Sequence, residues 1–241
     1  MSSHSFHALH RFLPRAVLIT TGLLFAGPNY PAQAALIADP LGDFLPTYTG
    51  PQDPGLDVVA HEVILAGDRM NFFGRMAGPI SPTQAIGGLY LIGVDRGQGT
   101  PRFLNSPASP PPIGPNVLWD FIVRINANGT GAAVNSLLGI TTTLDPLDIA
   151  INGNEFNASV PLSLMLPAAT RSPEQWTYNL WPRNGVGQNV QVSDLAPDDG
   201  NSPVHSVPEP VSLILYGIGA VVLIAHGRLR RKSHELLRKL R

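Results

Sequence analysis

Between residues 35 and 203 the chain is divided into short apolar runs by Gly, Pro, Asn and Asp, at intervals of roughly eight to fifteen residues. No window in this stretch has a helical period, which excludes long helices. The runs are rich in β-branched and aromatic residues and have the length of strands; they lie at 56–68, 69–78, 87–95, 117–125, 147–166 and 174–181. The sequence therefore predicts an all-β body, an antiparallel β-sandwich of about eight strands.

Alternation of apolar and polar residues within one run indicates a sheet with one buried face and one solvent-exposed face. In "VLWDFIVRI", the side chains expected to face the core are Trp119, Phe121, Val123 and Ile125, and those between them are Leu118, Asp120, Ile122 and Arg124. Turns are predicted at Gly67-Asp68, at 127–131 and at Asn152-Gly153. The proline-rich stretch 105–115 is predicted to be a surface loop, because proline cannot sit in a central strand.

The body is acidic although the whole chain is nearly neutral. Residues 35–208 hold seven arginines, no lysine and fifteen Asp or Glu, a net charge of −8. This charge argues against nucleic acid as a partner, since phosphate binding needs clustered cations, and favours neutral, cationic or metal-bridged partners. The chain has no cysteine, so its stability cannot depend on disulfides.

The N-terminus has the order of parts of a secretory signal peptide. Arg11 and Arg15 precede an apolar core at 16–26, and Ala32-Gln33-Ala34 follows a turn. An A-x-A site of this kind, with Ala32 and Ala34 as its small residues, predicts cleavage after Ala34. The alternative is an N-terminal membrane anchor, although about eleven apolar residues are too few to span a bilayer.

The C-terminus carries an uncharged segment of membrane-spanning length. Residues 210–227 would form a helix about 27 Å long, close to the roughly 30 Å thickness of the hydrocarbon core. The Arg and Lys residues that follow Gly227 would remain cytoplasmic and leave the acidic body outside. The polar segment 193–206, without apolar periodicity, is predicted to be a stalk between body and membrane.

The start of this C-terminal region is a stiff tetrapeptide that a plain anchor does not need. The prolines of Val207-Pro208-Glu209-Pro210 hold the chain extended, a form that a processing enzyme can grip; a rigid linker is the alternative. This tetrapeptide, the apolar span and the Arg230-Arg231 cluster together resemble a PEP-CTERM sorting domain.

The resemblance implies an exosortase as partner, a membrane enzyme thought to process such proteins near the Pro-Glu-Pro motif and to release or transfer them to the outer surface of a Gram-negative cell. The expected organisation is a signal peptide at 1–34, a β-sandwich at 35–192, the stalk at 193–206, the sorting signal with its transmembrane helix at 207–232 and a basic cytoplasmic tail at 233–241. The final location is then the cell surface or the extracellular matrix, where exopolysaccharide is a candidate partner. The body is expected to be structural or adhesive there.

Elimination argues against an enzyme. The body has two histidines, His61 and His205, no cysteine and no Gly-x-Ser-x-Gly motif, so the usual nucleophiles and cysteine-ligated zinc are excluded. His61 is expected on a strand face rather than as a ligand. A paired-carboxylate hydrolase remains open, and its candidate acids are Glu62, Glu155 and Glu174.

Four aspartates near the start of the body form a candidate calcium site, and calcium is the one cofactor that the residues themselves suggest. Asp39, Asp43, Asp53 and Asp57 lie in a Gly- and Pro-rich segment whose backbone carbonyls could complete an oxygen shell. Their spacing is not that of an EF-hand, and aspartates that form solvated turns are the alternative.

The other candidate ligand is carbohydrate. Tyr90, Trp119, Trp176, Tyr178 and Trp181 could stack on sugar rings, and the alternative is that they belong to the core. The body also resembles sandwiches related to DOMON domains and family 9 carbohydrate-binding modules, in "DPLGDFLPTYTGPQDPGLDVVAHEV" and "YLIGVDRGQGT". That resemblance implies a membrane-anchored ligand-binding module as the alternative function, and by analogy a haem with Met70 or Met76 as axial ligand.

Overall fold

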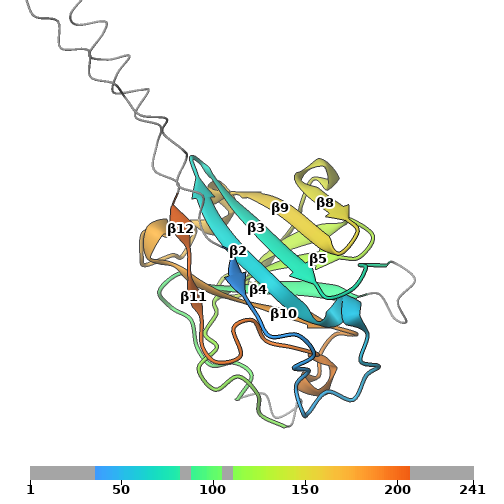
Figure 1. The fold of residues 1–241 in the computed structure, drawn as a ribbon. Coiled ribbons are helices and arrows are strands. Elements are labelled where there is room, and N and C mark those ends of the chain that lie inside the picture. Colours follow the sequence, from blue (N-terminus) through green and yellow to red (C-terminus); the bar gives the residue numbers. More distant parts are fainter. Residues whose placement is uncertain (1–35, 82–87, 105–110, 207–241) are drawn as a thin grey trace, which may run out of the picture. The chain divides into compact units, whose positions relative to one another are not determined.

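Two β-sheets form the framework of the described part of the chain (Figure 1). The computed structural model describes residues 36–81, 88–104 and 111–206. Within these ranges the only α-helix is α1, Leu162–Met165. The described residues contain no helix that is long and apolar enough to cross a membrane. The all-β prediction is confirmed, whereas the cleavage site at Ala32 and Ala34, the sorting signal and the basic tail lie outside the described residues.

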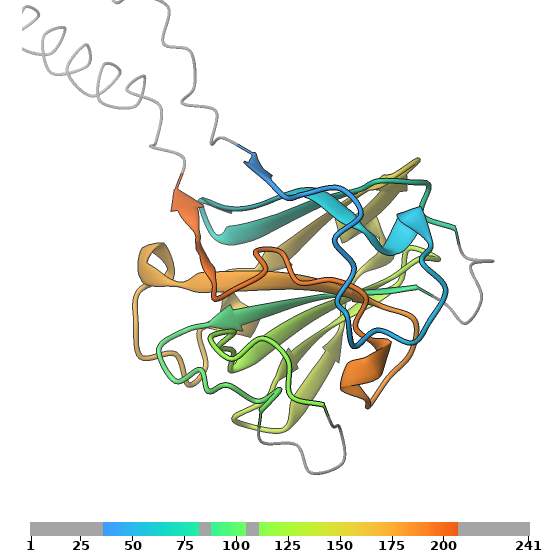
Figure 2. The same cartoon turned by 60° about the horizontal axis from the view of Figure 1, so that its bottom comes forward.

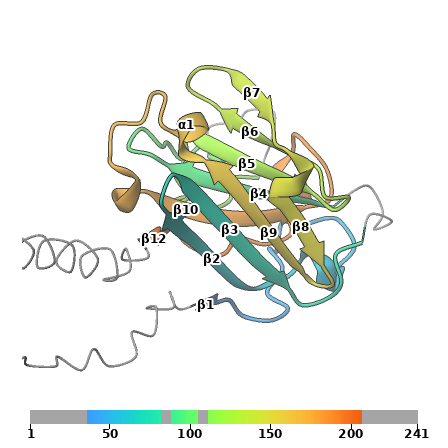
Figure 3. The same cartoon turned by 90° about the horizontal axis from the view of Figure 1, so that it is seen from above.

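The first sheet has the order β1-β2-β3-β9-β8, and β12 also pairs with β2. All its pairings are antiparallel except that of β12 with β2. Figure 3 shows β2, β3, β9 and β8 side by side in this layer. The bounds are β1 Ile37–Ala38, β2 Val58–Ala66, β3 Arg69–Met76, β8 Ile149–Asn152, β9 Glu155–Pro161 and β12 His205–Ser206.

The second sheet is antiparallel throughout and has the order β11-β10-β4-β5-β6-β7. Its longest strand pairing, β4 with β10, is in register over seven residues, from Leu89 opposite Arg183 to Asp95 opposite Thr177. The bounds are β4 Leu89–Asp95, β5 Phe121–Asn126, β6 Gly131–Asn135, β7 Ile140–Thr143, β10 Thr177–Arg183 and β11 Ser202–Pro203.

The main hydrophobic core lies between the two sheets. It takes Phe72 and Phe156 from the first sheet and Tyr90, Phe121 and Tyr178 from the second, all of them fully buried. Side chains alternate between buried and half-buried along β3 and β5, as expected when one face of a strand meets the core. The predicted alternation is therefore confirmed within β5, at Phe121, Val123 and Ile125. It was wrong just before this strand, where Asp120 is fully buried and Trp119 is half-buried.

The Phe156 side chain lies over a glycine of the neighbouring strand, Gly74 in β3. A Cβ atom added at Gly74 would lie 2.4 Å from the ring of Phe156 in β9, which is far inside van der Waals contact. Glycine here lets the Phe156 ring fill the space above the neighbouring strand, where it packs against Tyr90 with ring centroids 5.4 Å apart.

The turns that connect the hairpins agree with the sequence. Gly67 and Gly153 have φ of +60° and +64°, a conformation that glycine adopts without strain, and they connect β2 to β3 and β8 to β9. The prediction was incomplete in strand number, since each sheet has six strands. Two-residue strands such as β1, β11 and β12 are too short for any periodicity, and the Ala- and Thr-rich β6 and β7 lack an apolar pattern.

The prediction of a stalk at 193–206 was wrong, because this segment belongs to the folded body. Ser193, Asp194, Leu195 and Ala196 are each at most 1 % exposed, and β11 and β12 add to the two sheets. The polar residues are satisfied internally: the Ser193 hydroxyl donates to the carbonyls of Leu56, at 2.7 Å, and Pro182, at 3.0 Å. Polar composition therefore did not mean solvation, because these groups pair with backbone that lies between the sheets.

Candidate metal centre

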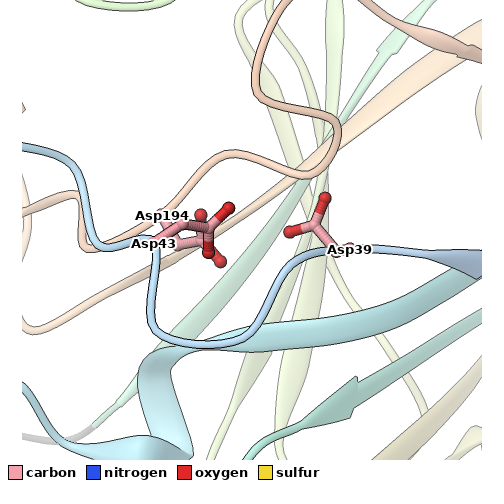
Figure 4. Close-up of side chains that lie close together, drawn as sticks. All are labelled: Asp39, Asp43 and Asp194. Atoms are coloured by element: carbon pink, nitrogen blue, oxygen red, sulfur yellow. The ribbon is translucent and has the colours of Figure 1, made fainter.

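Three aspartates from opposite ends of the body meet at one point. One carboxylate oxygen from each of Asp39, Asp43 and Asp194 lies within 4.8 Å of the other two. Figure 4 shows the first two on the loop that follows β1 and Asp194 on the segment that follows β10. Asp39 and Asp43 are half-buried, whereas Asp194 is completely buried.

The loop with Asp39 and Asp43 is held against the start of β2. β1 pairs with His61 and Ala60, and the Asp39 N–H then donates to the carbonyl of Val59 at 3.1 Å. The chain reverses through Gly42, whose φ of +79° lies in the left-handed region. Pairing of β1 with β2 and this turn together bring Asp43 back beside Asp39.

Backbone N–H groups of β2 and of the next residue hold the Asp194 carboxylate. Its Oδ2 accepts from the Val58 N–H at 2.9 Å and its Oδ1 from the Leu195 N–H at 2.7 Å. Two hydrogen bonds between Leu180 and Ala196 hold the same segment beside β10. The Asp194 carboxylate is thus held in one position at the cluster. It binds the N–H of Val58, a residue 136 positions earlier in the sequence.

Asp57 lies behind this group and is 3 % exposed. Its Oδ2 accepts from the Gly42 N–H at 2.9 Å, in the same turn that carries Asp43. Its Oδ1, Asp39 Oδ2 and both oxygens of Asp43 are buried and accept no hydrogen bond from any other described residue; Asp43 contacts its own backbone N–H. Buried oxygens without donors are uncommon in folded proteins, so this group calls for an explanation.

The electrostatics of the cluster disfavour four bare negative charges. Burial, and then the charges of Asp194 and Asp43, raise the pKa of Asp39 to about 8. Burial likewise raises the pKa of Asp194 to about 7, against the lowering effect of the Val58 N–H. Burial also raises the pKa values of Asp43 and Asp57. No ion pair within the described ranges includes any of the four carboxylates, so no side-chain cation offsets their charge.

This arrangement can bind a cation, and its donor atoms narrow the choice of ion. All of them are carboxylate oxygens, which suit the hard cation Ca²⁺. Zinc sites use nitrogen and sulfur ligands, which these four residues do not supply. Without a cation, one or more of the carboxylates would have to keep its proton near neutral pH.

The structure brings together part of the set that the sequence suggested. Asp39, Asp43 and Asp57 lie in or beside the cluster. Asp53 serves elsewhere, since its Oδ1 accepts from the Gly55 N–H at 2.8 Å and caps the 3₁₀ turn Pro54–Leu56. Sequence reasoning missed Asp194, because a segment taken for a solvated stalk gave no sign that it returns to β2.

The aromatic residues proposed for sugar stacking belong to the interior instead. Tyr90, Trp176 and Trp181 are each at most 1 % exposed, so the prediction that their rings face a ligand was wrong. Trp119 is half-buried, and the guanidinium of Arg102 covers one face of its ring at 4.8 Å from the centroid. Large aromatic side chains bury too much apolar area to be left outside when a sandwich core is available.

The haem analogy also finds no support in the placement of the methionines. Met70 and Met76 are both 0 % exposed and pack in the hydrophobic core between the sheets. An axial sulfur ligand has to face the haem iron, and here both methionine side chains are surrounded by core side chains. The residues present therefore do not fit this cofactor.

The three acids proposed for a hydrolase have different surroundings in the structure. His61 is buried in β2, as expected for a strand residue, with Nδ1 3.1 Å from the Tyr178 hydroxyl. Glu62 lies beside His205, with its Oε1 3.8 Å from Nδ1, and Glu155 pairs with Arg75. Glu174 is exposed.

Comparison with known proteins adds no relative. No family model matches the chain, and no curated protein matches it.

Proposed function

We propose that the chain is an exported protein that an exosortase processes at Val207-Pro208-Glu209-Pro210 and that then serves at the cell surface or in the exopolysaccharide matrix. Its role there is structural or adhesive and not enzymatic. The signal peptide, the apolar span and the Arg230-Arg231 cluster support this proposal from the sequence. The structure bears on this proposal through the position of its last described strand relative to the motif.

The observation that carries the proposal is that folded structure continues to the residue before the motif. β12 ends at Ser206 and pairs in parallel with Ile64 and Leu65 of β2. Val204, just before it, is buried in the main core, and its N–H donates to the carbonyl of Trp176 at 3.0 Å. Processing near Pro208 would therefore release the body with all its described strands.

Both ends of the described body lie along one edge of β2. β1 enters antiparallel opposite His61, and β12 leaves parallel opposite Leu65, so the two lie next to each other (Figure 2). His61 and Leu65 are four positions apart along β2, which corresponds to about 13 Å. If either end of the body is attached to the cell surface, the attachment lies at this edge of the first sheet. The second sheet, on the other side of the core, would then be available to bind matrix components.

The alternative, a membrane-anchored carbohydrate-binding module, gains no support from the described residues. Its proposed stacking residues Tyr90, Trp176 and Trp181 are part of the interior. The acidic surface suits bridging by divalent cations to acidic polysaccharide, or direct contact with basic partners.

The test is to determine the mature C-terminus of the protein after the full chain is produced in a Gram-negative host that has an exosortase. Mass spectrometry should find a terminus close to Pro208 in the secreted protein, and the double variant Pro208→Ala, Pro210→Ala should stay in the membrane fraction. Pro112→Ala, Pro115→Ala makes the same chemical change at two exposed positions of a distant loop and should be processed normally. A wild-type chain that keeps Arg241 and remains in the membrane would refute the proposal.

A further inference from the structure

We propose that Asp39, Asp43, Asp57 and Asp194 bind one Ca²⁺ ion, which joins the N-terminal loop of the body to the segment that leads to the sorting signal. The cluster is more than a group of surface acids. Asp194 is completely buried and Asp57 is 3 % exposed. Surface aspartates point into water, whereas these side chains are held inside the fold by backbone N–H groups.

Asp57 supplies the observation that points independently to a ligand. One of its oxygens accepts from the Gly42 N–H, which orients the carboxylate toward the turn that carries Asp43. The other oxygen is buried and has no hydrogen-bond partner among the described residues. The hydrogen bond from Gly42 places the Asp57 carboxylate beside the turn that carries Asp43. A buried carboxylate with one unpartnered oxygen, beside three other carboxylates, is the setting that a bound cation relieves.

Calcium suits the group better than other common cations. Ca²⁺ accepts six to eight oxygen ligands in flexible geometry, and carboxylates bind it through one or both oxygens. Asp39 Oδ2 and both oxygens of Asp43 are unused by other residues and face the fixed oxygens of Asp194. Magnesium demands a near-ideal octahedron and keeps several waters, which a half-enclosed cluster of four carboxylates does not favour.

The ion would connect segments that are far apart in the sequence. Asp39 and Asp43 belong to the loop after β1, Asp57 immediately precedes β2, and Asp194 begins the segment that carries β11 and β12. Without the ion, mutual repulsion would act between the loop and this last segment. Calcium is therefore expected to stabilise both ends of the body together. This inference does not depend on exosortase processing.

The first experiment measures calcium binding and thermal unfolding of the full chain, purified in detergent and treated with a chelator. Isothermal titration with CaCl₂ should show one site, and the melting temperature should rise on calcium addition. Asp43→Asn is the test variant because it removes a charge but no hydrogen bond to another residue. Its affinity should fall by about tenfold or more, since affinity in such sites follows the number of ligand charges.

Asp68→Asn is the matched control, with the same change at an exposed hairpin turn. It should bind calcium like the wild type. Without calcium, Asp43→Asn should melt no lower than the wild type, which separates lost binding from lost folding. Hydrogen exchange should show calcium-dependent protection of both 38–45 and 193–198 in the wild type. Absence of binding, or equal binding by wild type and Asp43→Asn, would overturn the proposal.

Discussion

Replacing Asp120 by Asn should cost this fold a large part of its stability, because Asp120 neutralises a fully buried arginine. Asp120 and Arg96 are both 0 % exposed, and Arg96 Nε lies 2.6 Å from Asp120 Oδ1. The other oxygen of Asp120 accepts from the backbone N–H groups of Arg96, at 3.1 Å, and Gln98, at 3.0 Å. One carboxylate thus connects the end of β4 with the start of β5.

The size of the effect follows from what remains after the substitution. The Arg96 guanidinium would still donate to the carbonyls of Met165 and Pro167 and lie over the Phe121 ring. It would keep its charge, however, without a counterion and away from water. Removing one partner of a buried ion pair typically costs about 3–5 kcal/mol, which is a large share of the roughly 5–15 kcal/mol that stabilises a typical domain.

The assay is urea unfolding followed by tryptophan fluorescence, with Glu155→Gln as the matched control. Glu155 forms an ion pair of nearly the same length, 2.7 Å to Arg75 Nε, but its side chain is 30 % exposed and that of Arg75 is 40 % exposed. Solvent screens this pair, so its loss should cost no more than about 1 kcal/mol. If the two substitutions reduce the free energy of unfolding equally, burial does not determine the strength of these pairs and the reasoning fails.

Two further predictions concern the core. Burial lowers the pKa of His61 to about 4 from an ordinary 6.5, so unfolding takes up a proton at His61 between these pH values. From pH 7 to pH 4 the His61 contribution to stability should fall by about 3 kcal/mol relative to a His61→Gln variant, and identical pH profiles of the two proteins would contradict this. Gly74→Ala would place a Cβ 2.4 Å from the Phe156 ring and should lower the free energy of unfolding by about 1–3 kcal/mol; an unchanged urea midpoint would show that the ring can move.

Sequence reasoning located the longer strands well. The runs at 56–68, 69–78 and 87–95 contain β2, β3 and β4, and a glycine with positive φ lies in each of the three predicted turns. These signals are local, because a run of β-branched residues and a turn glycine act within a few positions of each other. Strands of two residues carry no such signal, and they form only because a neighbouring strand offers unpaired backbone groups.

The candidate site was predicted only in part. Asp39, Asp43 and Asp57 lie close together in the sequence, so their spacing alone made them candidate ligands. Asp53, equally close, caps a 3₁₀ turn instead. Whether an aspartate caps a turn or faces a cluster depends on which backbone N–H groups its side chain reaches, and spacing alone does not show this.

The sequence by itself determined the all-β class, the acidic charge of the body and the positions of its main turns, because these depend on composition and on neighbours along the chain. Only the tertiary structure decided that Asp194 meets Asp39, that residues 193–206 are folded, and that the aromatic side chains lie inside. Each of these depends on contacts between segments more than a hundred residues apart or on the packing of one sheet against the other. Such contacts arise when the two sheets close over a common core, and no local pattern encodes their partners.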